Sequence, residues 1–211
     1  DRCAGEDAPG RRSAARAELG AAEDELVMLF VGSGFVKKGL DRALQALASL
    51  AAETACRLLV VGQDKETRFR RLAARLGIEN RVHFLGGRDD VPELLLAADV
   101  LIHPALDEAA GIVLLEALVA GLPVLVTDVC GYAHYIERSG AGRVLPSPFT
   151  QDALDEALQQ SLNHGWREAC RSAGLAYAAS EDLYSMHETG ARLIEQQLQK
   201  RSVGVAGAGR P

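Results

Sequence analysis

Short apolar runs alternate along this chain with segments whose apolar residues recur at helical spacing. Between residues 39 and 52, apolar positions return every three or four residues, so a helix here would lay one apolar stripe on a sheet. This alternation predicts right-handed βαβ crossovers and a Rossmann-like α/β fold with a doubly wound parallel sheet. The predicted strands are Leu26–Val31, Arg57–Val61, Val82–Leu85, Val100–His103, Pro123–Thr127 and Arg143–Leu145. The predicted helices among them are Gly39–Ala52, Lys65–Leu76, Pro92–Ala98 and Ala109–Val119.

The two ends of the chain depart from this alternation. Residues 1–25 are charged and rich in alanine and glycine, which predicts an interdomain linker with one short helix at Arg12–Leu19. Beyond the last strand the pattern is helical, at Gln151–Leu162, Trp166–Ala179 and Leu183–Lys200. We therefore expect a linker over 1–25, a Rossmann-like domain over 26–180, a C-terminal helix over 181–200 and a disordered tail over 201–211.

Composition and charge exclude several kinds of partner. With 211 residues, 48% of them hydrophobic, the chain can bury a core. Its net charge of −6 argues against a nucleic acid held by a general basic field. The cysteines lie far apart, which indicates neither a zinc site nor a disulfide framework and fits a reducing cytosol. No apolar run approaches the roughly 20 residues of a membrane-spanning helix, and no signal peptide is recognisable, so a cytoplasmic protein is expected.

Two glutamates, Glu108 and Glu116, flank the start of the helix predicted after the fourth strand. The first N–H groups of that helix, around Ala110, Gly111 and Ile112, lack intrahelical partners and can donate to a phosphate. Glu108 lies where a carboxylate accepts hydrogen bonds from sugar hydroxyls, and Glu116, roughly 9 Å further along the axis, is placed for a ribose. In open parallel sheets, ligands bind outside the carboxyl ends of strands. The alternative is that Glu108 only complements the helix dipole.

The loop after the first strand, residues 32–39, is rich in glycine and carries two lysines. It matches neither a dinucleotide fingerprint, which needs glycine in place of Lys37, nor a P-loop. The loop instead joins a flexible turn, with Ser33 and Gly34, to Lys37 and Lys38 at a helix N-terminus. Cations are unfavourable there unless an anion lies nearby, so the pattern indicates a bound diphosphate. Two solvated lysines on a loop are the alternative.

Further candidates follow the third and fifth strands. Arg88 is placed to brace a base, or else to pair with Asp89 or Asp90 on the surface. Tyr132 and His134 are placed to contact a sugar, while the alternative is that the tyrosines of this loop pack at a helix start. The histidines form no ligand motif and the chain contains no Asp-x-Asp pair, so no metal site and no cofactor are predicted.

Taken together, these motifs resemble the C-terminal half of GT-B glycosyltransferases of the retaining family 4, and the resemblance extends from Leu26 to Lys200. Four of the strings are similar more closely to the bacterial lipopolysaccharide core glucosyltransferases, which transfer the first hexose from UDP-glucose to inner-core heptose. The motifs that carry the family resemblance are Val31-Gly32 with Lys38-Gly39, Val60-Val61-Gly62, residues 82–86, residues 108–117 and residues 120–124. The strings that carry the closer one are residues 61–65, His103-Pro104-Ala105, residues 108–113 and residues 130–136.

The resemblance implies a retaining, metal-independent hexose transfer in which Lys38 and Glu108 act at the reacting diphosphate and hexose. Lys38 would neutralise the diphosphate, Glu108 would bind the hexose and Glu116 the ribose. The Arg88 loop would hold the uracil, and Tyr132 and His134 are candidates for the acceptor side. Further donor-binding positions are Ser33, Gly34, Lys37, Ala110, Gly111, Ile112 and Val113. Many family members carry arginine where this chain has Ser33, so part of the phosphate charge must be met otherwise.

The same resemblance places the acceptor site on an N-terminal domain, to which residues 183–200 would cross back. Alone, the chain should bind the donor weakly and transfer nothing. The expected partners are a UDP-hexose and lipopolysaccharide inner-core heptose, at the inner face of the bacterial inner membrane, with peripheral membrane association of the full-length enzyme. A non-catalytic nucleotide-sugar-binding module and a UDP-sugar epimerase of the GT-B fold are the alternatives. The identity of the hexose stays open among glucose, galactose and an aminohexose.

Overall fold

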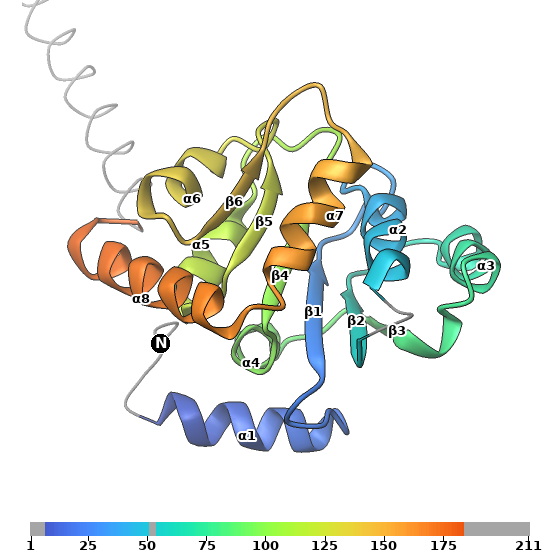
Figure 1. The fold of residues 1–211 in the computed structure, drawn as a ribbon, viewed down its shortest axis with the longest axis horizontal. Coiled ribbons are helices and arrows are strands. Elements are labelled where there is room, and N and C mark those ends of the chain that lie inside the picture. The colour runs from blue at the N-terminus through green and yellow to red at the C-terminus, as the bar shows by residue number, and fades with distance from the viewer. Residues whose placement is uncertain (1–6, 51–53, 184–211) are drawn as a thin grey trace, which may run out of the picture. The chain divides into compact units, whose positions relative to one another are not determined.

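A single six-stranded parallel sheet forms the centre of the computed structural model, which describes residues 7–50 and 54–183. The strands run in the order β3-β2-β1-β4-β5-β6 (Figure 1). Their side chains are mostly buried because helices cover the sheet, and five of the six residues of β1 are buried. The bounds are β1 Leu26–Val31, β2 Cys56–Val61, β3 Val82–Gly86, β4 Val100–His103, β5 Val124–Thr127 and β6 Gly142–Leu145.

Helices line the sheet on both faces, as the βαβ alternation requires. The apolar stripe of α2 and the inner side of α7 close one core over the sheet, around Phe30, Phe35 and Leu44. Helices α4, α5 and α6 follow strands β3, β4 and β5 in the chain, and α4 contacts both α1 and α5 (Figure 1). The bounds are α1 Ala8–Glu18, α2 Leu40–Leu50, α3 Thr67–Arg75, α4 Val91–Ala97, α5 Ile112–Ala120, α6 Ala133–Ser139, α7 Gln151–Gln160 and α8 His164–Ser180, with a 3-10 turn at Glu79–Arg81.

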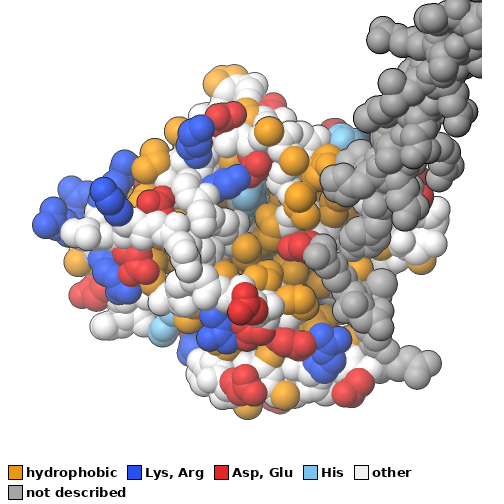
Figure 2. Space-filling view, turned by 180° about the vertical axis from the view of Figure 1, so that it is seen from behind, with side chains coloured by type: hydrophobic (Ala, Val, Ile, Leu, Met, Phe, Trp, Pro, Cys, Tyr) orange, Lys and Arg blue, Asp and Glu red, His pale blue; other side chains and the backbone are white. Residues whose placement is uncertain are grey.

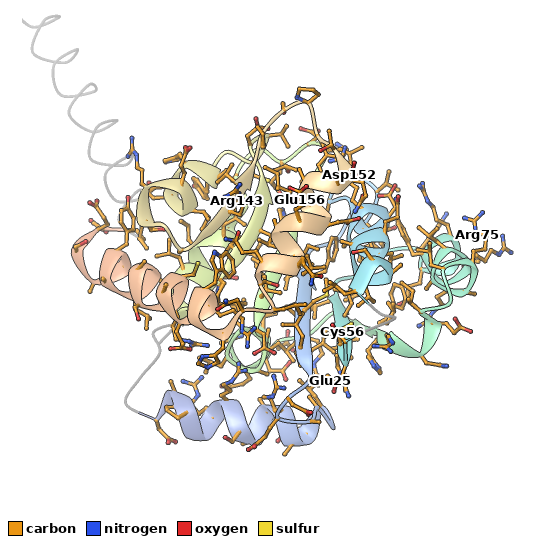
Figure 3. All side chains as sticks on the ribbon, in the orientation of Figure 1. Glu25, Cys56, Arg75, Arg143, Asp152 and Glu156 are labelled. Atoms are coloured by element: carbon orange, nitrogen blue, oxygen red, sulfur yellow. The ribbon has the colours of Figure 1, made fainter. Side chains whose placement is uncertain are left out.

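Helix α1 is tied to the sheet by buried charges. The Asp99 carboxylate accepts hydrogen bonds from Arg12 at 2.6 Å, from Arg16 at 3.0 Å and from the Val27 N–H at 2.8 Å. Near the other end of this helix, Glu25 precedes β1 (Figure 3). Its carboxylate pairs with Arg57 at 2.7 Å. The described residues up to Ala179 belong to one compact unit, α1 included.

The predicted α/β class and parallel sheet are confirmed, and every strand is found within one residue of its predicted bounds. Helix α5 begins at Ile112, three residues later than predicted, because Gly111 takes a left-handed conformation with φ of 83° and ends the loop there. No bounds were predicted for helix α6, although the alternative for this loop placed its tyrosines at a helix start. The predicted helix over 183–200 and the tail over 201–211 lie outside the described residues, apart from Leu183. Among the helices that are described, none is long and apolar enough to span a membrane.

Candidate functional site

The strand order reverses between β1 and β4, and this reversal creates the site. From β1 the chain moves outward to β2 and β3 on one side, while β4, β5 and β6 continue on the other. Loops that leave the carboxyl ends of two strands at such a switch point form a crevice where ligands bind. The loop after β1 carries Ser33, Gly34, Lys37 and Lys38, and the loop after β4 carries Glu108. The order of the strands thus brings the two principal predicted segments together.

Lys38 and Glu108 meet in this crevice. The Lys38 ammonium forms an ion pair with the Glu108 carboxylate, and their side chains are only 21% and 12% exposed. Burial lowers the pKa of Lys38 from its ordinary value. Lys37 differs from its neighbour because its side chain is 74% exposed and lies 3.6 Å from Asp107 on the surface. Of the two lysines, Lys38 is therefore the one held in the crevice.

Backbone contacts hold the two loops against each other. The Leu106 N–H donates to the Lys37 carbonyl at 2.7 Å, and Arg42 donates to the Pro104 and Ala105 carbonyls at 3.1 and 3.2 Å. A Cβ at Gly39 would lie 2.0 Å from the Pro104 oxygen, so no larger residue fits at this crossing. The two loops are therefore held against each other in advance of any ligand.

The β1 loop is also braced from the loop after β2. The Phe35 N–H donates to the Asp64 carboxylate at 2.7 Å, and the Gln63 N–H donates to the Ser33 hydroxyl at 3.1 Å. Hydrogen bonds from the N–H groups of Lys65 and Phe35 lower the pKa of Asp64. Sequence reasoning assigned no role to Asp64, and it placed Ser33 at the donor. In the structure the Ser33 hydroxyl orders the loop, and contact with a donor stays a prediction.

The start of α5 opens into the same crevice. The first N–H groups of a helix lack intrahelical acceptors, and those of Gly111, Ile112 and Val113 find no other partner among the described residues. The Ala110 N–H is directed back to Glu108 Oε1 at 3.4 Å. Because α5 begins at Ile112, Glu116 lies four residues into it, about 6 Å along the axis rather than the predicted 9 Å. The N–H groups that remain open are therefore those of Gly111, Ile112 and Val113, and their contact with a phosphate stays a prediction.

The loop between β5 and α6 supports the Glu108 loop from the other side. The Gly131 N–H donates to the Glu108 carbonyl at 3.2 Å, and the Tyr132 N–H donates to the Ala110 carbonyl at 2.9 Å. Tyr132 packs edge-on against Tyr135, with ring centroids 5.8 Å apart. This contact agrees with the alternative that the tyrosines of this loop pack against their neighbours at a helix start. His134 is exposed, and its Nδ1 lies 2.8 Å from the Gly131 carbonyl. The acceptor-side roles of Tyr132 and His134 stay predictions.

His103, at the carboxyl end of β4, is a site residue that sequence reasoning missed. Its side chain is 1% exposed, and Nε2 lies 3.5 Å from Glu108 Oε2. Neither ring nitrogen makes a hydrogen bond with the described residues. Burial, together with the charge of Lys38, lowers the pKa of His103 from 6.5 to about 4, so the ring is neutral at pH 7. A histidine at the end of an otherwise apolar strand was the available signal.

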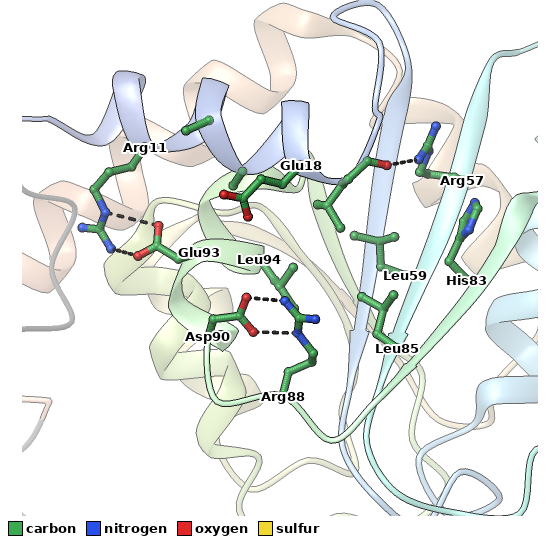
Figure 4. Close-up of a pocket in the computed structure, with 13 residues that line it drawn as sticks. Arg11, Glu18, Arg57, Leu59, His83, Leu85, Arg88, Asp90, Glu93 and Leu94 are labelled. Atoms are coloured by element: carbon green, nitrogen blue, oxygen red, sulfur yellow. Dashed lines mark hydrogen bonds and ion pairs between the residues drawn. The ribbon is translucent and has the colours of Figure 1, made fainter.

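Arg88 takes the surface-pair alternative. Its guanidinium donates to both carboxylate oxygens of Asp90, at 2.7 and 2.5 Å. This pair borders a cavity of about 680 Å³ that is lined by residues of α1, α4, β2 and β3, with Leu59, Leu85 and Leu94 as apolar lining (Figure 4). On that side of the molecule, apolar side chains gather near the centre and charged ones along the lower edge (Figure 2). Neither Lys38 nor Glu108 lines this cavity, and a contact of Arg88 with uracil stays a prediction.

No group of three His, Cys, Asp or Glu side chains that could hold a metal ion occurs within residues 7–50 and 54–183. The groups available to an anion in the crevice are the Lys38 ammonium and the N–H groups at the start of α5. Both suit a diphosphate, because a cation and open helix N–H groups each favour negative charge. Beside them, the Glu108 carboxylate is an acceptor for hydroxyl groups.

Known proteins share this sequence pattern. The family described as Glycosyl transferases group 1 matches residues 11–176. The lipopolysaccharide glucosyltransferase WaaG of Escherichia coli strain K12 is 48% identical over 201 residues, which are 92% of this chain and 53% of WaaG. The N-acetyl-alpha-D-glucosaminyl L-malate synthase of Bacillus anthracis is 31% identical over 177 residues, 82% of this chain and 46% of that protein. The chain thus spans about half the length of the curated relatives it matches.

Solved structures share the fold. The crystal structure of WaaG, a glycosyltransferase involved in lipopolysaccharide biosynthesis, superposes on this structure with a TM-score of 0.88 at 48% sequence identity. The superposition covers 92% of this chain and 53% of the WaaG chain. Anabaena Alr3699/HepE in complex with UDP and glucose gives a TM-score of 0.78 at 25% identity, with 89% of this chain and 53% of that one covered. By the extent of the family match and its identity to WaaG, this chain belongs to the group 1 glycosyltransferases.

Proposed function

We propose that the chain is the donor-binding domain of a glycosyltransferase that moves a hexose from a UDP-sugar to the inner-core heptose of lipopolysaccharide. The observation that carries the proposal is the meeting of Lys38 and Glu108 at the switch point, beside the open start of α5. A nucleotide-sugar needs a cationic site for its diphosphate and an acceptor site for its hexose hydroxyls, a few ångströms apart. The crevice supplies both.

The transfer breaks the bond between the hexose C1 and the diphosphate oxygen. The oxygen of the acceptor hydroxyl forms the new bond to C1, and its proton passes to the released UDP. Negative charge grows on the leaving UDP as the bond breaks. Lys38 and the N–H groups of Gly111, Ile112 and Val113 would stabilise that charge, which is a larger effect in the transition state than in the bound donor. Glu108 would orient the hexose, and Glu116 would contact the ribose.

Glucose is the hexose we propose, with a retaining and metal-independent transfer as in family 4. WaaG, 48% identical, is a lipopolysaccharide glucosyltransferase, and HepE, with the same fold, was solved with UDP and glucose. Metal independence is supported by Lys38 and the α5 N–H groups, which can balance a diphosphate without a divalent cation. We place the protein in the cytoplasm, at the inner membrane surface where its proposed acceptor is built.

A second domain would complete the enzyme by closing over this edge of the sheet. In the described part of the chain, the exposed large apolar side chains all lie on this edge of the sheet or at the start of α5. They are Val36, Leu106, Ile112 and Val129, exposed by 41% to 57%. Exposed apolar groups that gather on one edge are typical of a surface that another domain or a ligand covers. The acceptor heptose would bind on that second domain.

A UDP-sugar epimerase and a non-catalytic binding module are the competing functions. Both would use the same crevice, so donor binding alone does not separate them from a transferase. An epimerase interconverts the hexose of UDP-sugars or releases it to water, whereas a transferase needs the heptose acceptor. Incubating the full-length protein with UDP-glucose, with and without a heptose-bearing acceptor, distinguishes all three.

The binding site itself is tested by calorimetric titration of UDP into this chain, with and without EDTA. We expect the same affinity in both conditions, because lysine and backbone N–H groups carry the charge. ADP is the control nucleotide, since it presents the same diphosphate on a different base, and it should bind more weakly. Loss of UDP binding in EDTA would contradict metal independence. The absence of UDP binding in either condition would contradict the proposed function.

A further inference from the structure

Lys38 and Glu108 neutralise each other in the structure, although the proposed function needs each of them elsewhere. The ammonium of Lys38 belongs on the diphosphate and the Glu108 carboxylate belongs on the hexose. A diphosphate that enters the crevice competes with Glu108 for the same ammonium. If Lys38 turns to the phosphates, Glu108 loses its cation while its side chain is only 12% exposed. A carboxylate left unpaired in such a place is costly, so a second partner for it is required.

His103 is placed to be that partner. Its ring lies stacked near Phe30, with centroids 6.5 Å apart and planes 25° from parallel, and it is 1% exposed. A neutral imidazole carries one N–H, yet neither nitrogen has a hydrogen bond among the described residues. Buried polar atoms are nearly always hydrogen-bonded, so a ring without a partner calls for an explanation. The 3.5 Å between Nε2 and Glu108 Oε2 is just beyond hydrogen-bond length.

We infer that donor binding exchanges the partners of Glu108: Lys38 turns to the diphosphate, and His103 donates from Nε2 to the carboxylate in its place. This inference rests on the proposed function. His103 is then a positioning residue, which touches no part of the donor and acts through Glu108. With the Ala110 N–H near Oε1 and His103 on Oε2, both oxygens are held from behind. The remaining lone pairs face outward to the hexose hydroxyls.

The geometry of side-chain amides makes this exchange testable. A glutamine amide nitrogen reaches about as far as the histidine Nε2, whereas an asparagine amide nitrogen ends near the position of Nδ1. His103→Gln therefore keeps a donor toward Glu108, and His103→Asn moves the donor away from it. His103→Leu has no donor at all and fills a similar volume. Loss of a hydrogen bond to a charged group weakens binding by about tenfold or more.

The experiment is a calorimetric titration of UDP into this chain, with the variants made singly and in a Glu108→Ala background. We expect His103→Gln to bind within about twofold of the unmodified chain, and His103→Asn and His103→Leu to bind about tenfold more weakly. In the Glu108→Ala background, where no carboxylate needs a partner, His103→Leu should change UDP affinity by less than twofold. Circular dichroism establishes that each variant is folded, and if His103→Leu is not, the comparison of Gln with Asn decides.

Three outcomes overturn the inference. A loss of affinity that persists in the Glu108→Ala background would make His103 a packing residue. The same would follow if the Gln and Asn variants bound alike, or if the Leu variant bound like the unmodified chain. In all three cases the unmodified chain still binds UDP, so the proposed function stands. Failure of the unmodified chain to bind UDP would overturn the proposed function together with this inference.

Discussion

The opposite charges of two single residues, Lys38 and Glu108, balance each other in the crevice before any ligand binds. Lys38, Glu108 and the neutral ring of His103 lie together, and the burial that lowers the pKa of Lys38 also lowers that of His103. Lys38 and Glu108 were predicted from sequence, because each stands in a loop of recognisable character. His103 and Asp64 were not, since their contacts depend on which loops the strand order brings together.

The depressed pKa of His103 predicts how stability changes with pH. In the unfolded chain the ring binds a proton near pH 6.5, but in the folded chain only near pH 4, so acid favours unfolding. The contribution of neutral His103 is complete above pH 6.5 and is lost as pH falls toward 4, by about 3 kcal/mol in all at ~1.4 kcal/mol per pKa unit. Lys38 adds to the effect of burial by repelling the imidazolium.

Urea denaturation at several pH values between 4 and 7 measures this dependence. The His103→Gln variant is the control, because glutamine does not titrate while the carboxylates of the protein remain. We expect the free energy of unfolding to fall by about 3 kcal/mol less in the variant over this range. Parallel pH curves for the two proteins would show that the ring is not held neutral by its surroundings.

Whole elements were predictable where burial alone decides them. The strands are continuous apolar runs, because both faces of a doubly wound sheet are covered, and each was found within one residue. The start of α5 was predicted too early, since composition does not reveal that Gly111 takes a positive φ. Helix α6 was not assigned because only Ala133 and Ile136 of its residues are buried, so it shows no clear apolar period. The equally short α4 was predicted because Pro92 marks its start and its apolar residues are consecutive.

The link between α1 and the sheet yields a prediction about stability. Asp99 accepts hydrogen bonds from Arg12 and Arg16, and Arg16 is 8% exposed, so removing the carboxylate leaves a buried cation unpaired. We expect Asp99→Ala to lower the free energy of unfolding by about 3–5 kcal/mol. Asp90→Ala is the matched control, because it also removes an aspartate bound to an arginine, but on the surface.

Surface ion pairs contribute about 0–1 kcal/mol, so Asp90→Ala should scarcely change the urea midpoint. The difference between the two variants in the free energy of unfolding measures how much the buried ion pairs of Asp99 stabilise the attachment of α1. Losses of equal size would mean that Asp99 contributes no more than an exposed ion pair.

The architecture of the whole molecule explains why its site could be located from sequence although its details could not. A parallel α/β sheet gathers the ends of its strands at one edge, so motifs that follow β1 and β4 must lie near each other. Their mutual contacts, such as the exclusion of any Cβ at Gly39 by the Pro104 carbonyl, depend on angles that no sequence pattern specifies. The partner of Arg88 was likewise not decided by the sequence. In the structure its side chain pairs with Asp90, beside a different cavity.

We propose above all that a nucleoside diphosphate binds on Lys38, in the crevice between β1 and β4. The most direct test of this proposal is the calorimetric affinity of this chain for UDP in two neighbouring variants, Lys38→Ala and Lys37→Ala. Each removes one positive charge, but Lys38 lies in the crevice and Lys37 is 74% exposed beside Asp107. We expect UDP affinity to fall by about tenfold or more in Lys38→Ala, which is the contribution of a charge-assisted hydrogen bond, and by less than about threefold in Lys37→Ala. Equal losses, or unchanged affinity in Lys38→Ala, would contradict this proposal.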